Sequence, residues 1–249
     1  MSSVESSNVS LSMGKRMGRP SRSLKVYLGI VVALVATHIV LAVLPVTHVM
    51  QAQSALSSWP AVAAFTLLGL AGVWLAGKSG FAGMWDEQVS TWQRLGLPAL
   101  SGALFGGVLA VVVNGLIRLP GQIHIPFPVS ILFYAYGGIE SEILLRLFLL
   151  PLFVWLISSV LLRKRGQTAV FWVGAILLSL LEPLMQFGGA MQMGALDGVA
   201  LPLVGLMLAV IYAVNLVSAI LFRRSGFLAP LTVRLALYLV WHVIVGGLV

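Results

Sequence analysis

The chain has 249 residues, of which 59% are hydrophobic and only 9% are charged, whereas a soluble domain carries about 25% charged residues. This composition excludes a soluble globular protein and indicates an integral membrane protein with room for about seven spans of about 20 residues. The net charge of +8 comes from lysine and arginine residues that lie mainly between the apolar runs, as in membrane proteins whose orientation is set by such residues. We therefore expect membrane lipids, and no nucleic acid, as partners. The absence of cysteine excludes disulfides and thiolate metal sites.

Residues 1–25 are rich in serine and end in a group of basic residues. They predict a flexible basic cytoplasmic tail that can touch anionic lipid headgroups. The apolar run that follows is too long for a cleaved signal peptide and lacks a small-residue cleavage site close behind it, which favours a retained first span. Residues 26–249 are then expected to form a single transmembrane helical domain.

Seven apolar runs follow one another, at 26–46, 60–77, 96–117, 129–162, 168–188, 199–222 and 227–249. They predict an all-α, polytopic membrane helix bundle. One crossing for each run, with the N-terminus inside, places twelve of the fifteen lysine and arginine residues on the cytoplasmic side, as the positive-inside rule requires. We expect a bacterial plasma (inner) membrane protein with a cytoplasmic N-terminus, and the residues do not indicate its oligomeric state.

The fourth run is too long for one simple crossing. As a continuous helix it would measure about 51 Å at about 1.5 Å per residue, against a hydrocarbon core of about 30 Å. Gly137 and Gly138 are the natural place for a break, which predicts a short re-entrant or interfacial piece over 129–136 before the fourth span. On the third run, Gly102, Gly106 and Gly107 suit close packing of helices.

Ionisable side chains lie deep within three of the runs. Counted from the basic residue at the cytoplasmic end of each helix, at about 1.5 Å per residue, four of them lie about 25 to 30 Å away: Glu142, Arg146, Glu182 and His242. Residues one turn apart share a helix face and extend these into polar stripes, Glu182 with Gln186, and Arg234 with Tyr238 and then His242. Glu140 is expected to point to a different side from Glu142.

An isolated charge at membrane depth costs about 2.5 kcal/mol or more, so such groups persist in pairs or in hydrated cavities. The converging stripes therefore predict a polar chamber inside the bundle that performs chemistry or moves an ion. The alternative is structural: Glu142 and Arg146 neutralise each other, and the remaining groups satisfy the bundle core.

Two stretches resemble a known family. GGIESEILLRLFLLP resembles the EExxxR motif of the CAAX prenyl protease and bacteriocin-processing (CPBP) family of glutamic intramembrane proteases. RRSGFLAPLTVRLALYLVWHV resembles the closing segment of that family, where Gly-x-Leu-x-x-Pro leads into HxxxN or HxxxD. The resemblance covers roughly residues 95–249 and is that of a divergent member. It implies an endopeptidase that hydrolyses peptide bonds of membrane-associated substrates.

The chain departs from the family pattern at several catalytic positions. Aligned on Arg146, Glu142 takes the second glutamate of the motif, and Ser141 replaces the first, which activates water in the family. Glu182 and Gln186 replace the Phe and His of FxxxH, and Arg234 and Tyr238 replace the later His and Asn or Asp. Two interpretations stay open: a peptidase with an altered catalytic set, or an inactive relative acting as a membrane peptide-binding scaffold or small transporter.

Peptide hydrolysis needs a base for water, a donor for the oxyanion and an acid for the leaving amine. Glu182, on a helix that is expected to be broken by Pro183, has no basic residue within a turn and is the better candidate base, while Glu142 paired to Arg146 is the better scaffold. His242 could shuttle protons, and the candidate oxyanion donors are Gln186, Arg234 and Tyr238. Zinc held by Glu142, Glu182 and His242 is an alternative without a supporting ligand spacing, so we expect no cofactor.

Overall fold

The computed structural model describes residues 22–44, 58–117, 125–163, 165–192 and 194–248. Over these residues the chain forms helices and no β-strand, and seven of the helices are long and apolar enough to cross a membrane. The prediction of an all-α polytopic membrane bundle is therefore confirmed. Most of the predicted basic tail, and Arg118 between the third and fourth spans, lie outside the described residues.

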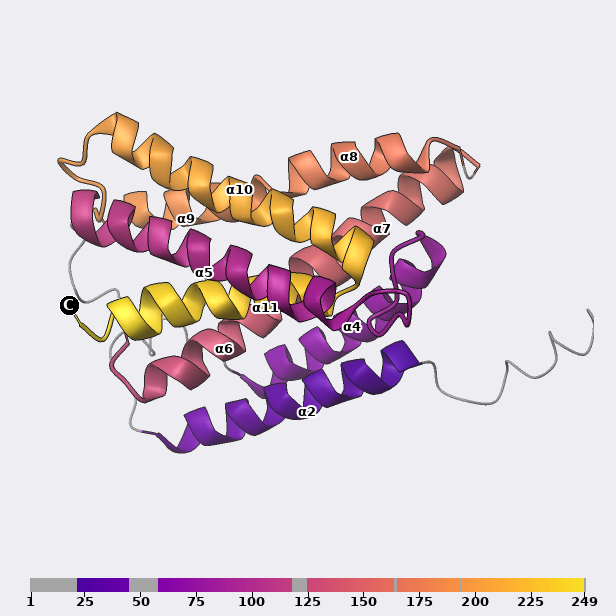
Figure 1. Cartoon of the computed structure of the whole chain (residues 1–249), viewed down its shortest axis with the longest axis horizontal. Coiled ribbons are helices and arrows are strands. Elements are labelled where there is room, and N and C mark those ends of the chain that lie inside the picture. Colours follow the sequence, from indigo (N-terminus) through magenta and orange to yellow (C-terminus); the bar gives the residue numbers. More distant parts are fainter. Residues whose placement is uncertain (1–21, 45–57, 118–124, 164, 193, 249) are drawn as a thin grey trace, which may run out of the picture.

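The seven spans are built from α-helical pieces, which Figure 1 labels, and from π-helical pieces, which are named η in the text. The first two are α2 (Arg22–Val43) and α4 (Trp59–Lys78). The third joins η1 (Trp92–Gly96), α5 (Leu97–Leu109) and η2 (Ala110–Ile117). The fourth joins α6 (Val129–Glu142), η4 (Ile143–Leu149), α7 (Leu150–Val154) and η5 (Trp155–Leu161). The last three are α8 (Gln167–Leu178) with α9 (Leu181–Gln192), then α10 (Leu201–Ser225), then α11 (Leu228–Tyr238) with η6 (Leu239–Val245).

Successive spans alternate in direction, so their basic ends gather at one end of the bundle, on the right in Figure 1. At this end Arg223 donates to the Thr168 hydroxyl at 3.1 Å. The guanidinium of Arg94 lies 4.3 Å from the ring centre of Trp85, and the same residue is only 3% exposed. This gathering of basic residues at one end is expected when spans that alternate in direction carry basic residues at every second connection.

The break expected at Gly137 and Gly138 is not present, so no separate re-entrant or interfacial piece precedes the fourth span. The chain is helical without interruption from Val129 to Leu161. Gly138 instead permits a close approach of α6 to α11, since a Cβ atom there would lie 3.2 Å from Cγ of Arg234 and 3.5 Å from Cδ2 of Tyr238. A glycine within an apolar run can either break a helix or allow close packing against another helix, and the sequence alone does not distinguish the two.

Close helix approach recurs between α5 and α11. A Cβ atom on Gly106 would lie 2.7 Å from the Leu237 carbonyl oxygen, and one on Gly102 would collide with the Val233 carbonyl. The sequence-based prediction is confirmed for these two glycines and wrong for Gly107, which has nothing within 4 Å of its added Cβ. This packing holds α11, which carries Arg234, firmly against α5.

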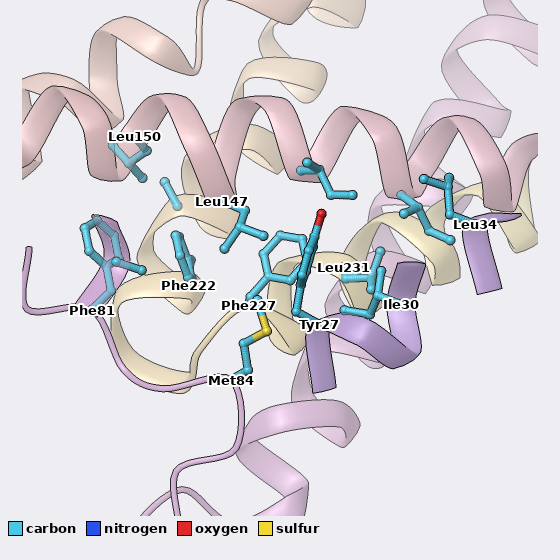
Figure 2. Packing of buried hydrophobic residues seen from close by; sticks show 14 of the residues in the cluster. Tyr27, Ile30, Leu34, Phe81, Met84, Leu147, Leu150, Phe222, Phe227 and Leu231 are labelled. Carbon is cyan, nitrogen blue, oxygen red and sulfur yellow. The ribbon is translucent and has the colours of Figure 1, made fainter. Parts of the chain in front are cut away.

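A hydrophobic core joins the first, second, fourth, fifth, sixth and seventh spans. Figure 2 shows Leu147 and Leu150 of the fourth span beside Tyr27 of α2 and Phe222 of α10. The hydroxyl of Tyr27 is buried and donates to the Thr66 carbonyl at 2.9 Å. The core thus fixes the fourth span around the segment that carries Glu142 and Arg146, because Ile139, Ile143 and Leu147 belong to it.

Candidate functional site

A proline positions the first acidic side chain of the site. The fifth span is interrupted by a turn at Ser179 and Leu180, between α8 and α9. Pro183 causes the interruption because it has no N–H to donate to the carbonyl of Ser179 and its ring would clash with that carbonyl. Glu182 therefore lies in the first turn of α9. The expectation that Pro183 breaks this helix is confirmed.

Arg234 of α11 connects two carboxylates from different spans. Its Nε donates to Oε1 of Glu142 at 3.0 Å. Its two terminal nitrogens donate to the two carboxylate oxygens of Glu182, each at 2.6 Å, which is the bidentate geometry that a planar guanidinium favours. Gln186 donates to the same Glu182 carboxylate at 3.1 Å. The structure thus brings Glu142, Glu182, Gln186 and Arg234 into one hydrogen-bonded network.

Asn215 of α10 also belongs to this network, and sequence reasoning missed it. Its Oδ1 accepts from Arg146 and, at 3.1 Å, from Arg234, while its Nδ2 donates to the Ile211 carbonyl at 2.9 Å. The side chain is fully buried. A lone asparagine deep in an otherwise apolar span was the signal that could have revealed it, because polar side chains at membrane depth need partners.

The predicted pair of Glu142 with Arg146 is replaced by the pair of Glu142 with Arg234. The prediction assumed an α-helix, in which residues four apart share a face. The helix changes to the π-helical segment η4 directly after Glu142, where backbone hydrogen bonds span five residues, so the α-helical spacing assumed for Glu142 and Arg146 does not hold there. Arg146 is 1% exposed and directs its terminal Nη2 to Asn215.

We call Glu142, Arg146, Glu182, Asn215 and Arg234 the charge cluster. Its two carboxylates balance its two guanidinium groups, so it is neutral as a whole when all four are ionised. The side chains of Glu142 and Arg234 are 0% and 3% exposed, and that of Glu182 is 12% exposed. Burial of a single ion costs several kcal/mol, so mutual neutralisation is what allows these groups to lie between membrane spans. Glu182, considered a base free of basic neighbours, is held by Arg234.

A cavity of about 530 Å³ lies beside the charge cluster, because it is lined by Gln186, which bonds to Glu182, and by Tyr238, whose ring lies near the Arg234 guanidinium. Its wall is mainly apolar and aromatic. The polar side chains in that wall are Glu140, Ser141, Tyr134, Gln186, Tyr238 and His242. Glu140 and Glu142 do point to different sides, as expected, but it is Glu140 that faces the cavity. Glu142 lies behind the wall and does not line it.

His242 is held within an aromatic group and not within the charge cluster. Its ring stacks on Tyr134, with the ring centres 4.0 Å apart and the planes 7° apart, and on Trp241, with the centres 4.1 Å apart. Trp241 is anchored in turn by donating to Oδ1 of Asn114 at 3.2 Å. Tyr238 lies between the two regions, with its ring 5.6 Å from the Arg234 guanidinium carbon and 5.4 Å from the His242 ring.

The three residues considered as zinc ligands are divided between these regions. Glu142 and Glu182 are bound to Arg234, whereas His242 stacks in the cavity wall. Within the described ranges no three histidine, aspartate or glutamate side chains lie close enough together to hold a metal ion. The geometry of these residues does not suit a zinc centre.

The fold and the site define a polytopic membrane protein with a buried, self-neutralised charge cluster beside an apolar cavity. Comparisons of the chain with protein-family models, with curated proteins and with solved structures give no match. The resemblance to CPBP proteases therefore rests on the quoted motifs alone.

Proposed function

We propose that the chain is a membrane protein that binds membrane-associated peptide segments in its cavity without hydrolysing them, as a non-catalytic relative of CPBP-type proteases. The observation that carries this proposal is the placement of Arg234. A general base must offer a lone pair to a water molecule. Both oxygens of Glu182 accept hydrogen bonds from Arg234, whose positive charge stabilises the ionised carboxylate and makes it a weak base, and Glu142 is fully buried and does not line the cavity.

The cavity has the properties of a binding site. A volume of 530 Å³ falls within the range of about 300 to 1,000 Å³ typical of ligand pockets, which are largely apolar with a few polar groups. Ser141, Gln186 and Tyr238 supply both donors and acceptors, which suit the N–H and C=O groups of a peptide. In the hydrocarbon core such backbone groups need partners from protein, because lipid offers none.

To test the proposal, the purified chain in lipid nanodiscs is mixed with an apolar peptide of about 20 residues, which is long enough to span the membrane. Binding of the peptide and its cleavage are then measured. We expect saturable binding by fluorescence anisotropy and an intact peptide by mass spectrometry. Cleavage that disappears in Glu142→Gln or Glu182→Gln would overturn the proposal in favour of a peptidase. Gly107→Ala is the matched control, since nothing lies within 4 Å of a Cβ added there.

A second candidate function is a CPBP-type peptidase in which Glu140, and not Glu142 or Glu182, is the general base. One observation favours it. Glu140 lines the cavity, and its Oε1 has no hydrogen-bond partner. If Glu140 activates water, cleavage in the same assay will be lost in Glu140→Gln and retained in Glu142→Gln. Absence of cleavage by the intact chain under conditions where the peptide binds would reject this candidate.

We further propose that the basic end of the bundle faces the cytoplasm of a bacterial cell. The gathering of basic residues at the end where α2 begins supports this orientation. A reporter fused after Val249 should therefore behave as extracytoplasmic, with active alkaline phosphatase and dark green fluorescent protein. A fusion after Arg163, at the opposite end of a span, is the control and should show the reverse. Cytoplasmic behaviour of the Val249 fusion would contradict the orientation.

A further inference from the structure

We propose that the bound peptide places a positively charged side chain, a lysine or an arginine, in the cavity, where the carboxylate of Glu140 recognises it. This inference rests on the proposed function and names the ligand chemistry of the same cavity.

The first support is the charge balance of the site. In the charge cluster, two guanidinium groups neutralise Glu142 and Glu182. Glu140 is outside this balance, although it lies only two residues from Glu142. Among the described residues that line the cavity, Glu140 is the one carboxylic acid, none is a lysine or an arginine, and the ring of the one histidine, His242, is stacked on Tyr134 and Trp241. When Glu140 is ionised, its charge is therefore left for a ligand to neutralise.

The second support is the surroundings of the Glu140 carboxylate. The residue is 5% exposed, and the hydroxyl of Tyr136, one turn earlier on α6, bonds to its carboxylate. The other oxygen, Oε1, is buried without a hydrogen-bond partner. A buried acceptor without a donor is unfavourable. An ammonium or guanidinium group of a ligand would supply the missing donor and the opposite charge together.

The third support is the composition of the wall around Glu140. Apart from the polar side chains, the wall is built of aliphatic and aromatic residues, the aromatic ones being Phe65, Phe133, Tyr134, Tyr238 and Trp241. Aromatic faces attract cations, and the methylene stem of lysine packs well on apolar surface. The cavity therefore suits both parts of a long basic side chain. Arg234 faces the charge cluster and is bound there by two carboxylates, so it does not compete for Glu140.

The experiment compares two apolar peptides of about 20 residues that differ at one central position, lysine in one and norleucine in the other. Norleucine keeps the four-carbon stem and removes the ammonium group. Binding to the full chain is measured in nanodiscs of phosphatidylcholine, a lipid without net charge. We expect the lysine peptide to bind at least about tenfold more tightly, as a buried charge-assisted hydrogen bond allows. Glu140→Gln should abolish this difference.

Gly107→Ala is the control, because Gly107 does not line the cavity and nothing lies within 4 Å of a Cβ added there, and it should keep the preference for lysine. If Glu140→Gln does not fold, Glu140→Asp, which retains the charge on a shorter stem, should reduce the preference. Equal affinity of the two peptides for the intact chain would overturn the inference and leave the proposed function standing. Failure of both peptides to bind would overturn the proposed function, and the inference with it. A lysine preference that persists in Glu140→Gln would overturn the role of Glu140.

Discussion

Replacing Arg234 by methionine is expected to prevent the chain from folding stably. The substitution removes the cation shared by Glu142 and Glu182 and leaves two carboxylates buried between spans. Loss of one partner from a buried ion pair typically costs about 3 to 5 kcal/mol, and this substitution breaks two pairs at once. Size-exclusion chromatography and thermal unfolding in detergent should show aggregation, or a strongly lowered midpoint.

Two further variants test whether the instability comes from the unbalanced buried charge and not from the removal of any arginine. Arg224→Met removes an exposed arginine from the last turn of α10 and should leave the midpoint nearly unchanged. The double variant Arg234→Met, Glu182→Gln leaves one carboxylate, Glu142, and one guanidinium group, Arg146, in the charge cluster, and should recover much of the stability lost in the single variant. An Arg234→Met protein as stable as the unmodified chain would show that the cluster does not support the fold.

Asn215→Leu should give the second large loss of stability. Asn215 accepts hydrogen bonds from Arg146 and Arg234 and has no exposed surface. A hydrogen bond to a charged group contributes about 1.5 to 3 kcal/mol, and leucine would leave both guanidinium groups without this acceptor. Thermal unfolding in detergent should show a midpoint well below that of the unmodified chain, with less effect than Arg234→Met because both ion pairs remain.

Ser218→Ala is the matched control for Asn215→Leu. Ser218 lies three residues later on α10 and is equally buried, but its hydroxyl has no hydrogen-bond partner. Its replacement should change the unfolding midpoint little. If Asn215→Leu and Ser218→Ala destabilise the chain equally, the effect comes from packing of α10 and not from the bonds to the two arginines.

The bundle could be predicted from the sequence because its signals are local to each span. Apolar run length gives the helices, and the spacing of basic residues gives their alternation. Pro183 likewise acts within its own helix, by removing one donor and displacing one carbonyl. Such effects need no knowledge of what lies beside the helix, so the break before α9 was foreseen correctly.

The pairing within the site depends on contacts between spans, which the sequence does not contain. Arg146 was assigned to Glu142 on helical spacing, but η4 changes that spacing and Arg234 arrives from another span. The sequence suggests a helix break at Gly138, because a glycine that lets a helix bend cannot be distinguished in the sequence from a glycine that lets two helices pack closely. Glu140 and Asn215 gain their significance only from the cavity and the arginines beside them.

The position of Arg234 along the chain also sets an order for biogenesis. Arg234 is synthesised 92 residues after Glu142 and 52 residues after Glu182. During translation, the fourth and fifth spans therefore enter the membrane with both carboxylates of the charge cluster, in addition to Glu140, and with Arg146 as the one cation of the cluster made so far. Insertion of α11 brings Arg234, which neutralises the second carboxylate of the charge cluster and joins the fourth, fifth and seventh spans. A nascent chain interrupted before this step carries an unbalanced charge within the bilayer, a feature by which membrane quality control can distinguish it from the finished protein.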